Sequence, residues 1–462
     1  MSEFRLDDLI ESTGATLLRG RGDEHLNGVS TDTRTLRSDQ LFLALDGPNF
    51  DGNRFAHDAV QRGAGCLLLR ADNPRPALIE DLPGETPVVV HDSPRRALAE
   101  LAAWHRQRLD IPVIGITGSC GKTTTKNILS ELLTDHRAVI SSPASFNNEI
   151  GVPHTLLLAD STTEALIVEM GTNQPGEIRT LCQTARPNAG IITNVGAAHL
   201  EGLGSVEGVA REKGDLAVSL PSDGFCVLND DCRWTRVLRT LTDARVITFS
   251  VDGRGDLNAT DVWFHPGGTT FRLNDEHEVT SPLLGLHTVQ NLLAALSAVV
   301  GLGIELRDVL PAVSRLKGER RRMERIEAGG FTIFDDSYNA NPDSARASVR
   351  VLAGLHGHAR RVLVLADMLE LGDFAAEMHH EVGRLAREAR IDLLILVGEL
   401  TCATAAGALE AGMRPDQVIH MKDVDEGMTQ VPGLIREGDV VLIKGSRAMG
   451  LDRLVGHLAD PV

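Results

Sequence analysis

A glycine-rich turn that carries a lysine follows the apolar segment 111–117. Glycines let backbone N–H groups approach a polyphosphate, and a neighbouring lysine adds positive charge near its β and γ groups. A threonine directly after the lysine supplies the hydroxyl that holds Mg²⁺ in such loops. The turn reads Gly118-Ser119-Cys120-Gly121-Lys122-Thr123-Thr124. It predicts a nucleotide-binding loop, with a purely structural turn as the alternative.

The segments that flank this turn have the patterns of a strand and a helix. Residues 111–117 are mostly apolar, and the apolar residues from Ile128 to Leu133 have helical spacing. The strict phosphate-loop pattern requires glycine where this chain has Ile116, and the first glycine comes one place earlier, at Gly115. We still expect a strand, a loop and a helix, because the lysine, the hydroxyl and both flanks agree.

Later in the chain, three more residues could act on the same phosphates. Glu169 ends an apolar segment, and Mg²⁺ prefers one or two carboxylates together with substrate oxygens. The alternative for Glu169 is an acid that faces solvent at a strand end. His199 follows the next apolar segment, although a loop histidine is more often structural. Lys213, taken alone, has the pattern of a solvated charge on a helix.

The last part of the chain contains further polar groups that could bind a nucleotide or an anion. A basic cluster, 320–322, precedes a polar string that holds Asp336 and Tyr338, the only tyrosine. A solvated cluster and an elaborate turn are the alternatives. Lys444 and Ser446 follow a late apolar segment and could bind an anion, or could simply begin a helix.

Composition excludes several classes of protein. The 462 residues carry a net charge of −18, which argues against non-specific binding to nucleic acid or to anionic membranes. The amino terminus lacks a signal-peptide pattern, and no apolar segment is long enough to span a bilayer. The six cysteines form no C-x-x-C pair, so we expect neither a disulfide framework nor a zinc site. We therefore expect a cytoplasmic protein without membrane insertion.

Patterning along the chain predicts an α/β protein of three regions, 1–108, 109–315 and 316–462. In the first region, strands are expected at 41–45, 66–69 and 88–90, with a Pro-rich loop at 72–87. In the central region, we expect strands at 165–170 and 190–194 and a closing helix that begins near His287.

The third region repeats an apolar segment that ends in polar, mostly glycine-containing sequence. Helical stretches separate these segments, which predicts a parallel, doubly wound sheet. Ligands gather at the carboxyl ends of such strands, so the polar ends should face a common cleft. The predicted strands begin at Phe331, Arg361, Asp392 and Asp439.

Taken together, these motifs resemble the Mur ligase family over essentially the whole chain. The marks of the resemblance are the phosphate loop and the strings 30–34, 50–52, 147–153, 169–178, 199–202, 335–342, 367–372 and 444–447. The resemblance implies a small α/β UDP-binding domain, a central P-loop-type ATPase α/β domain and a carboxyl-terminal Rossmann-like, doubly wound domain. It also accounts for the early glycine, because these ligases carry T-G-x-x-G-K-T.

The resemblance gives roles to residues whose pattern alone leaves them open. It implies a magnesium site of Thr123, Glu169 and His199, with Lys213 as a further ligand if it is carbamylated. It implies catalytic roles for Lys122, His199 and Lys213. It implies ATP contacts by the loop residues 118–124 and by His287, Asn291, Arg322, Asp336 and Tyr338, although neighbouring Arg320 leaves the arginine ambiguous. It implies substrate contacts by Ser30, Thr31, Asp32, Arg34, Asn147, Asn148, Lys444 and Ser446.

The activity that the resemblance implies is ATP-dependent ligation through an acyl phosphate. The motifs are most similar to those of the member that adds D-alanyl-D-alanine to a UDP-N-acetylmuramoyl-tripeptide in peptidoglycan synthesis. Expected partners are ATP, Mg²⁺ and these two small substrates, and we expect a monomer. Alternatives are another Mur ligase, a folylpolyglutamate synthetase-like enzyme, or a regulatory or motor P-loop ATPase. Gln174 and Asn53 depart from the family pattern near the substrate path.

Overall fold

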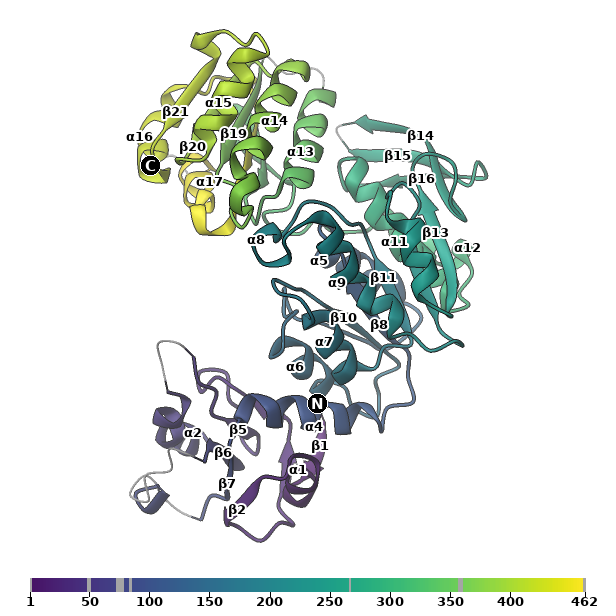
Figure 1. The fold of residues 1–462 in the computed structure, drawn as a ribbon, viewed down its shortest axis with the longest axis vertical. Coiled ribbons are helices and arrows are strands. Elements are labelled where there is room, and N and C mark those ends of the chain that lie inside the picture. Colours follow the sequence, from purple (N-terminus) through teal and green to yellow (C-terminus); the bar gives the residue numbers. More distant parts are fainter. Residues whose placement is uncertain are drawn as a thin grey trace.

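The computed structural model describes residues 2–47, 51–71, 79–82, 85–265, 267–355 and 360–459. Three main sheets follow one another along the molecule, with the amino-terminal sheet at the bottom, the central sheet in the middle and the carboxyl-terminal sheet at the top of Figure 1. Position 50 of the string 50–52, and positions 72–78 and 83–84 of the expected Pro-rich loop, lie outside the described residues. Across the described residues, we find no helix that is long and apolar enough to cross a bilayer.

The amino-terminal sheet has five strands in the order β2-β7-β6-β5-β4. Strands β5, β6 and β7 confirm the expected strands at 41–45, 66–69 and 88–90. The long helix α4 begins where Ser93 Oγ accepts a hydrogen bond from Arg96 N and Pro94 fills the first turn. The elements of this segment are β1 (Glu3–Arg5), α1 (Leu6–Thr13), β2 (Thr16–Arg19), β3 (His25–Asn27), β4 (Val29–Ser30), β5 (Leu41–Leu43), η1 (Gly52–Phe55), α2 (Ala56–Gln61), β6 (Cys66–Arg70), β7 (Val88–His91) and α4 (Pro94–Arg106).

The central sheet has nine strands in the order β16-β15-β14-β13-β12-β11-β8-β10-β9. Pairing is parallel from β9 to β14 and antiparallel beyond it. Every residue of β8 is buried, as its continuous apolar run predicts for an inner parallel strand. Its strands are β8 (Val113–Thr117), β9 (Val139–Ser141), β10 (Ala165–Glu169), β11 (Ala189–Ile192), β12 (Phe225–Asn229), β13 (Arg245–Ser250), β14 (Leu257–His265), β15 (Gly268–Leu273) and β16 (His277–Ser281).

Helices cover the central sheet and confirm the strand–loop–helix prediction, because β8 ends at Thr117 and α5 begins at Lys122. The predicted helix near His287 is α11, and α12 follows it without having been predicted. The helices are α5 (Lys122–Leu133), α6 (Gly151–Leu157), α7 (Glu177–Ala185), α8 (Leu200–Leu203), α9 (Val206–Val218), α10 (Thr235–Leu238), η2 (Arg239–Leu241), α11 (Leu286–Gly301) and α12 (Leu306–Val313).

The carboxyl-terminal sheet has the order β17-β18-β22-β19-β20-β21. The predicted parallel strands are β18 (Phe331–Asp336), β19 (Arg361–Ala366), β20 (Leu393–Val397) and β22 (Val440–Lys444). Two edge strands were not predicted: β17 (Glu324–Ala328), whose residues alternate between exposed and more buried, and the short β21 (Val418–Met421). The helices are α13 (Pro342–Gly354), η3 (Gly372–Phe374), α14 (Ala375–Glu388), α15 (Thr401–Glu410), η4 (Pro415–Gln417), α16 (Val424–Gln430), η5 (Val431–Gly433), η6 (Arg447–Met449) and α17 (Leu451–Ala459).

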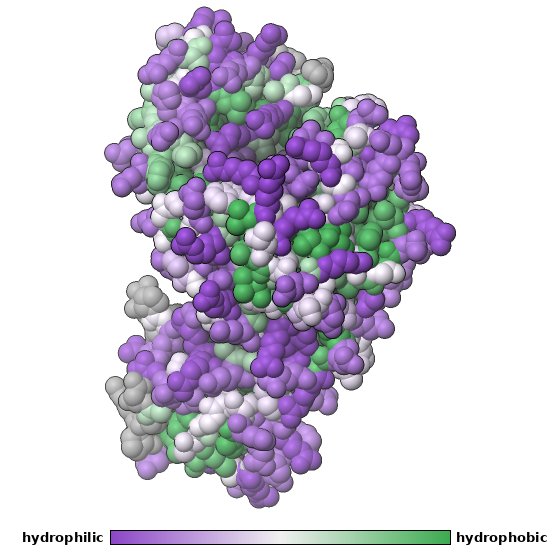
Figure 2. Space-filling view, turned by 45° about the vertical axis from the view of Figure 1, so that its right-hand side comes forward, coloured by the Kyte–Doolittle hydropathy of each residue, from purple (hydrophilic) through white to green (hydrophobic). Residues whose placement is uncertain are grey.

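The amino-terminal and central segments share one apolar core. It includes Phe4 and Leu98 from the first segment and Val152 and Ile178 from the central one. The carboxyl-terminal sheet has separate cores on its two faces. Hydrophilic side chains cover most of the face in Figure 2, and apolar side chains form smaller groups over the central part.

Candidate active site

A cleft of about 2220 Å³ lies between the central and carboxyl-terminal segments. The phosphate loop, the segment 193–199 and the start of α11 line it from the central side. From the other side it is lined by parts of 317–325, 334–348, 369–371 and 444–448. Three of the four polar strand ends therefore face the cleft, as predicted. The fourth, after β20, instead contacts Asp367, whose Oδ1 accepts a hydrogen bond from Thr401 N at 3.0 Å.

The geometry of the phosphate loop requires both of its glycines. Gly118 and Gly121 have φ values of +150° and +82°. A Cβ atom would lie 1.9 Å from Thr193 Oγ1 at Gly118 and 2.1 Å from Asn291 Oδ1 at Gly121. Helix α5 begins at Lys122, directly after the loop, and the first N–H groups of a helix can bind an anion.

Lys122 is the cation of this loop. Its Nζ donates a hydrogen bond to Gly118 O at 2.6 Å, which holds the charge over the loop. Burial lowers the pKa of Lys122, whereas the nearby Glu169 carboxylate raises it. The Lys122 charge therefore lies beside the backbone of the predicted phosphate loop.

The segment after β11 supports the phosphate loop from behind. Asn194 Oδ1 accepts a hydrogen bond from Cys120 N at 2.9 Å, and Thr193 Oγ1 donates to Cys120 O at 2.5 Å. Ser119 Oγ donates to Gly196 O at 3.1 Å. Burial raises the pKa of the Cys120 thiol, which makes it a weak nucleophile.

Glu169 has an oxygen that is available to a metal ion. The side chain is 1% exposed, and its Oε1 accepts a hydrogen bond from Asn147 Nδ2 at 2.9 Å. Its Oε2 is buried without a hydrogen-bond partner among the described residues and lies 3.7 Å from Lys126 Nζ. A hard cation bound with substrate oxygens would satisfy this atom. Thr123, at the base of the same loop, accepts a hydrogen bond from Arg322 Nη2 at 3.1 Å.

Lys126 is a buried neighbour of Glu169 that the sequence reasoning missed. It is fully buried, and its Nζ donates to Ser142 O at 2.7 Å and also to Ala144 O. Lys126 comes one helical turn after Lys122, and this spacing was the available signal that both lysines share a face of α5.

His199 lies in the turn before α8 with a left-handed φ of 54°. Its Nδ1 is 2.7 Å from Glu370 Oε2, an acid of the carboxyl-terminal segment. Burial lowers the pKa of His199, and the charge of Lys122 lowers it further. A neutral imidazole, which can bind a metal ion, is therefore favoured.

Lys213 is not the solvated charge that its pattern alone indicates. It is completely buried in α9, and its Nζ has no hydrogen-bond partner within the described ranges. Burial, followed by the charge of Lys122, holds the pKa of Lys213 far below its usual value. The preceding Glu212, also missed from sequence, accepts hydrogen bonds from Gly176 N at 2.6 Å and Ile178 N at 2.8 Å. It thereby fixes the loop before α7.

The other expected nucleotide contacts also line the cleft. His287 and Asn291 lie on α11, and burial lowers the pKa of His287. Asp336 Oδ2 accepts a hydrogen bond from Lys444 Nζ at 2.7 Å. The Tyr338 hydroxyl donates to Ser145 Oγ at 2.6 Å, between β9 and α6 of the central segment.

The expected substrate residues fall into two groups. Asn147, Asn148, Lys444 and Ser446 line the cleft. The string 30–34 lies in the amino-terminal segment instead, where Arg34 pairs with Asp32 at 2.6 Å and remains 84% exposed. Ser30 and Thr31 lie beside this pair.

Three family models match the chain in sequence order. They are the Mur ligase family, catalytic domain, at residues 25–106, the Mur ligase middle domain at 116–299, and the Mur ligase, glutamate ligase domain, at 321–447. A UDP-N-acetylmuramoyl-tripeptide–D-alanyl-D-alanine ligase from Escherichia coli is 37% identical and aligns over 95% of each chain.

The chain belongs to the Mur ligase family.

Solved structures agree with this membership. MurF from Acinetobacter baumannii matches with a TM-score of 0.90 and 28% identity, covering 99% of both chains. MurF ligase from Thermotoga maritima in complex with ADP matches with a TM-score of 0.81 and 26% identity, covering 94% of this chain and 97% of that one. The three-segment architecture described above is therefore that of Mur ligases.

Proposed function

We propose that this Mur ligase uses ATP to join D-alanyl-D-alanine to a UDP-N-acetylmuramoyl-tripeptide, which gives the UDP-muramoyl-pentapeptide of peptidoglycan synthesis. The observation that carries the proposal is the 37% identity, over 95% of each chain, to a ligase named for that reaction. The cleft supports it, because a lysine-bearing phosphate loop faces polar groups of a second segment across a space large enough for two substrates.

The first chemical step must bring two anions together. A carboxylate oxygen of the tripeptide forms a bond to the γ phosphorus of ATP, and the bond to the β–γ bridging oxygen breaks to release ADP. Lys122 and the N–H groups at the start of α5 offset the negative charge that builds up on the phosphates. Arg322 approaches the same region, since its Nη2 lies 3.1 Å from Thr123 Oγ1.

The second step forms the amide. The D-alanyl-D-alanine amine attacks the acyl carbon, a proton leaves the nitrogen, and the tetrahedral intermediate expels phosphate. Phosphorylation makes this possible because it turns a poor leaving group into a good one. Asn147, Asn148, Lys444 and Ser446 are proposed to align the two reactants, since all four line the cleft.

Magnesium fits the central side of the cleft. We propose that Glu169, Thr123 and His199 hold it, because Glu169 has a buried oxygen without a partner among the described residues. When bound, Mg²⁺ would neutralise phosphate charge and orient the transferred group. A ligand set with few carboxylates suits an ion that is also bound by substrate oxygens.

Lys213 is proposed to carry a carbamate. Its buried Nζ lacks a hydrogen-bond partner in the part of the chain that the structure describes, and burial favours the neutral amine. A neutral amine can attack CO₂ to form a carbamate and release one proton. The lysine would then present oxygen ligands to a second cation. A ¹³C resonance of a carbamate after exposure to labelled bicarbonate, absent from Lys213→Met, would support the modification.

The three proposed domains, 1–108, 109–315 and 316–462, have different proposed binding roles. We propose that Ser30, Thr31, Asp32 and Arg34 bind the UDP group. The central domain would hold ATP through the phosphate loop, His287 and Asn291, and the third domain would add Arg322, Asp336 and Tyr338. We further propose that the enzyme acts as a monomer in the cytoplasm.

A phosphate-release assay coupled to mass spectrometry tests the proposal. Purified enzyme receives ATP and Mg²⁺ with each UDP-muramoyl peptide in turn, together with D-alanyl-D-alanine, meso-diaminopimelate or glutamate. We expect phosphate release and pentapeptide only with the tripeptide and D-alanyl-D-alanine, and none after chelation of the metal. Equal ATP consumption without both joining partners would contradict the proposal and favour a motor or regulatory ATPase.

A further inference from the structure

Two acids of the carboxyl-terminal segment contact the central turn that carries His199. The turn runs from Gly196 to Glu201, between β11 and the end of α8. One acid, Asp343, lies in the first turn of α13, and the other, Glu370, follows β19. Both contacts cross the cleft, so the turn is shaped by groups of another segment.

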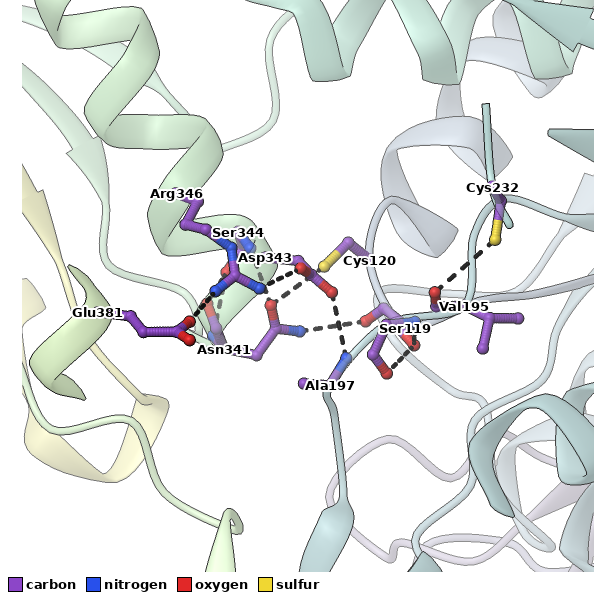
Figure 3. Close-up of polar contacts among 11 residues, drawn as sticks. Ser119, Cys120, Val195, Ala197, Cys232, Asn341, Asp343, Ser344, Arg346 and Glu381 are labelled. Atoms are coloured by element: carbon purple, nitrogen blue, oxygen red, sulfur yellow. Dashed lines mark hydrogen bonds and ion pairs between the residues drawn. The ribbon is translucent and has the colours of Figure 1, made fainter. Parts of the chain in front are cut away.

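Asp343 holds the start of this turn. Its Oδ2 accepts a hydrogen bond from Ala197 N at 3.2 Å, and its Oδ1 accepts one from Arg346 Nη2 at 2.7 Å. Arg346 is held in turn by Glu381, at 3.1 Å from its Nη1 (Figure 3). Asp343 also fills the space beside Gly196, where a Cβ atom would lie 1.6 Å from Oδ2.

The same helix start also contacts the phosphate loop. Asn341 caps α13, and its Oδ1 accepts a hydrogen bond from Cys120 Sγ at 3.2 Å. Its Nδ2 donates to Ser119 O at 3.4 Å, beside the Asp343 contact in Figure 3. The start of α13 is therefore seated on the phosphate loop and on the His199 turn together.

Glu370 holds the other end of the turn. Its Oε2 lies 2.7 Å from His199 Nδ1, and its carbonyl oxygen accepts a hydrogen bond from Glu201 N at 3.3 Å. His199 and Glu370 have φ values of +54° and +64°, a region that costs energy for residues other than glycine. Such conformations persist where surrounding contacts enforce them.

We propose that Asp343 and Glu370 are positioning residues that set His199 for the magnesium site. This inference rests on the proposed function. A histidine that binds a metal through one ring nitrogen usually donates its other N–H to a carboxylate, which fixes the orientation of the ring. With Nδ1 paired to Glu370, Nε2 is the nitrogen left for the metal. The magnesium site is then complete only while the carboxyl-terminal segment is docked.

The role concerns orientation more than stability. The Glu370 side chain is 57% exposed, and an exposed pair adds little to folding. Loss of an orienting partner of a metal ligand, in contrast, typically lowers metal affinity or activity by about 10–100-fold. The two effects can therefore be measured apart.

Binding of Mn²⁺ in the presence of ADP, followed by electron paramagnetic resonance, tests the inference on the full-length enzyme. We expect Glu370→Ala and Asp343→Ala to weaken Mn²⁺ binding by about 10–100-fold. The KM for the UDP-tripeptide should stay unchanged, and Glu370→Gln, which keeps an acceptor oxygen, should recover part of the affinity. Glu381→Gln is the matched control, because it touches Arg346 but not the turn, and it should behave like wild type.

A second pair of variants tests the contact at Gly196. Gly196→Ala should weaken Mn²⁺ binding because its Cβ meets Asp343, and adding Asp343→Ala should remove that clash and make the two effects non-additive. Wild-type affinity in both Glu370→Ala and Asp343→Ala, with the wild type binding Mn²⁺ normally, would overturn this inference alone. A wild-type enzyme that neither binds Mn²⁺ with ADP nor ligates would overturn the proposed function as well.

Discussion

Arg322 Nη2 donates a hydrogen bond to Thr123 Oγ1 at 3.1 Å and so joins the start of the carboxyl-terminal segment to the phosphate loop. The Arg322 guanidinium also lies 4.2 Å from the ring centroid of Tyr338, within the range of a cation–π contact. An arginine held on both sides presents its remaining N–H groups in a fixed direction, which suits recognition of phosphate.

Arg322→Ala should raise the KM for ATP by about 10–100-fold, because hydrogen bonds to charged groups contribute about 1.5–3 kcal/mol. Arg320→Ala is the matched control. Arg320 is exposed and, unlike Arg322, is not among the described residues that line the cleft. Steady-state kinetics of both variants decide which arginine contacts the nucleotide. A larger effect at Arg320 would reverse the assignment.

Lys122→Ala should lower kcat by about 10²–10³, the typical loss when a preorganised contact to developing charge is removed. Binding of the UDP-tripeptide, measured by calorimetry, should survive because its proposed contacts lie elsewhere. Lys422→Ala, which removes an exposed lysine, should leave the rate unchanged. Ligation at the normal rate by the Lys122 variant would refute the role of the loop.

Lys126→Met should destabilise the protein by about 3–5 kcal/mol, because it removes the cation that lies 3.7 Å from the buried Glu169 carboxylate. Urea denaturation measures the change. The double variant Lys126→Met/Glu169→Gln should lose less than the sum of the single variants, since it removes both charges. An unchanged midpoint for Lys126→Met would contradict the buried contact.

The free energy of unfolding should fall as the pH drops below about 6.5, the usual pKa of histidine. Burial lowers the pKa of His379, whose Nε2 accepts a hydrogen bond from Met368 N at 3.0 Å. The folded state therefore binds fewer protons than the unfolded state, so stability is present above the unfolded pKa and is lost on acidification.

Urea titrations between pH 5.5 and 7.5, roughly the range around that pKa, would reveal this slope. His379→Gln keeps a polar side chain that does not titrate in the range, so its slope should be smaller. Equal slopes in the two proteins would assign the acid sensitivity to other groups.

Local patterns predicted the elements whose burial is uniform. Strand β8, the phosphate loop and α5 could be foreseen because an inner strand is apolar throughout and the loop needs glycine. The alternating β17 could not, since its pattern also suits an exposed segment. The burial of Lys126 could not be predicted either, because its contacts with Ser142 and Ala144, outside its own helix, decide its environment.

Contacts between distant segments were also beyond local patterns. His199 and Glu370 are 171 positions apart, and neither spacing nor composition indicates that they meet. The family resemblance supplied expected roles for single residues such as His199. The partners that orient those residues emerged only from the arrangement of the segments.

The common apolar core of the first two segments has a mechanical consequence. Helix α4 packs on α6 and α7, and the Ser2 hydroxyl donates to Leu157 O at 2.9 Å. We therefore expect the amino-terminal and central segments to move together as one rigid body. The carboxyl-terminal segment has its own cores, and its contacts with the central segment include the polar ones made by Asp343 and Glu370. We therefore expect the enzyme to open by a rotation of the carboxyl-terminal segment alone, with a hinge in the residues that follow α12.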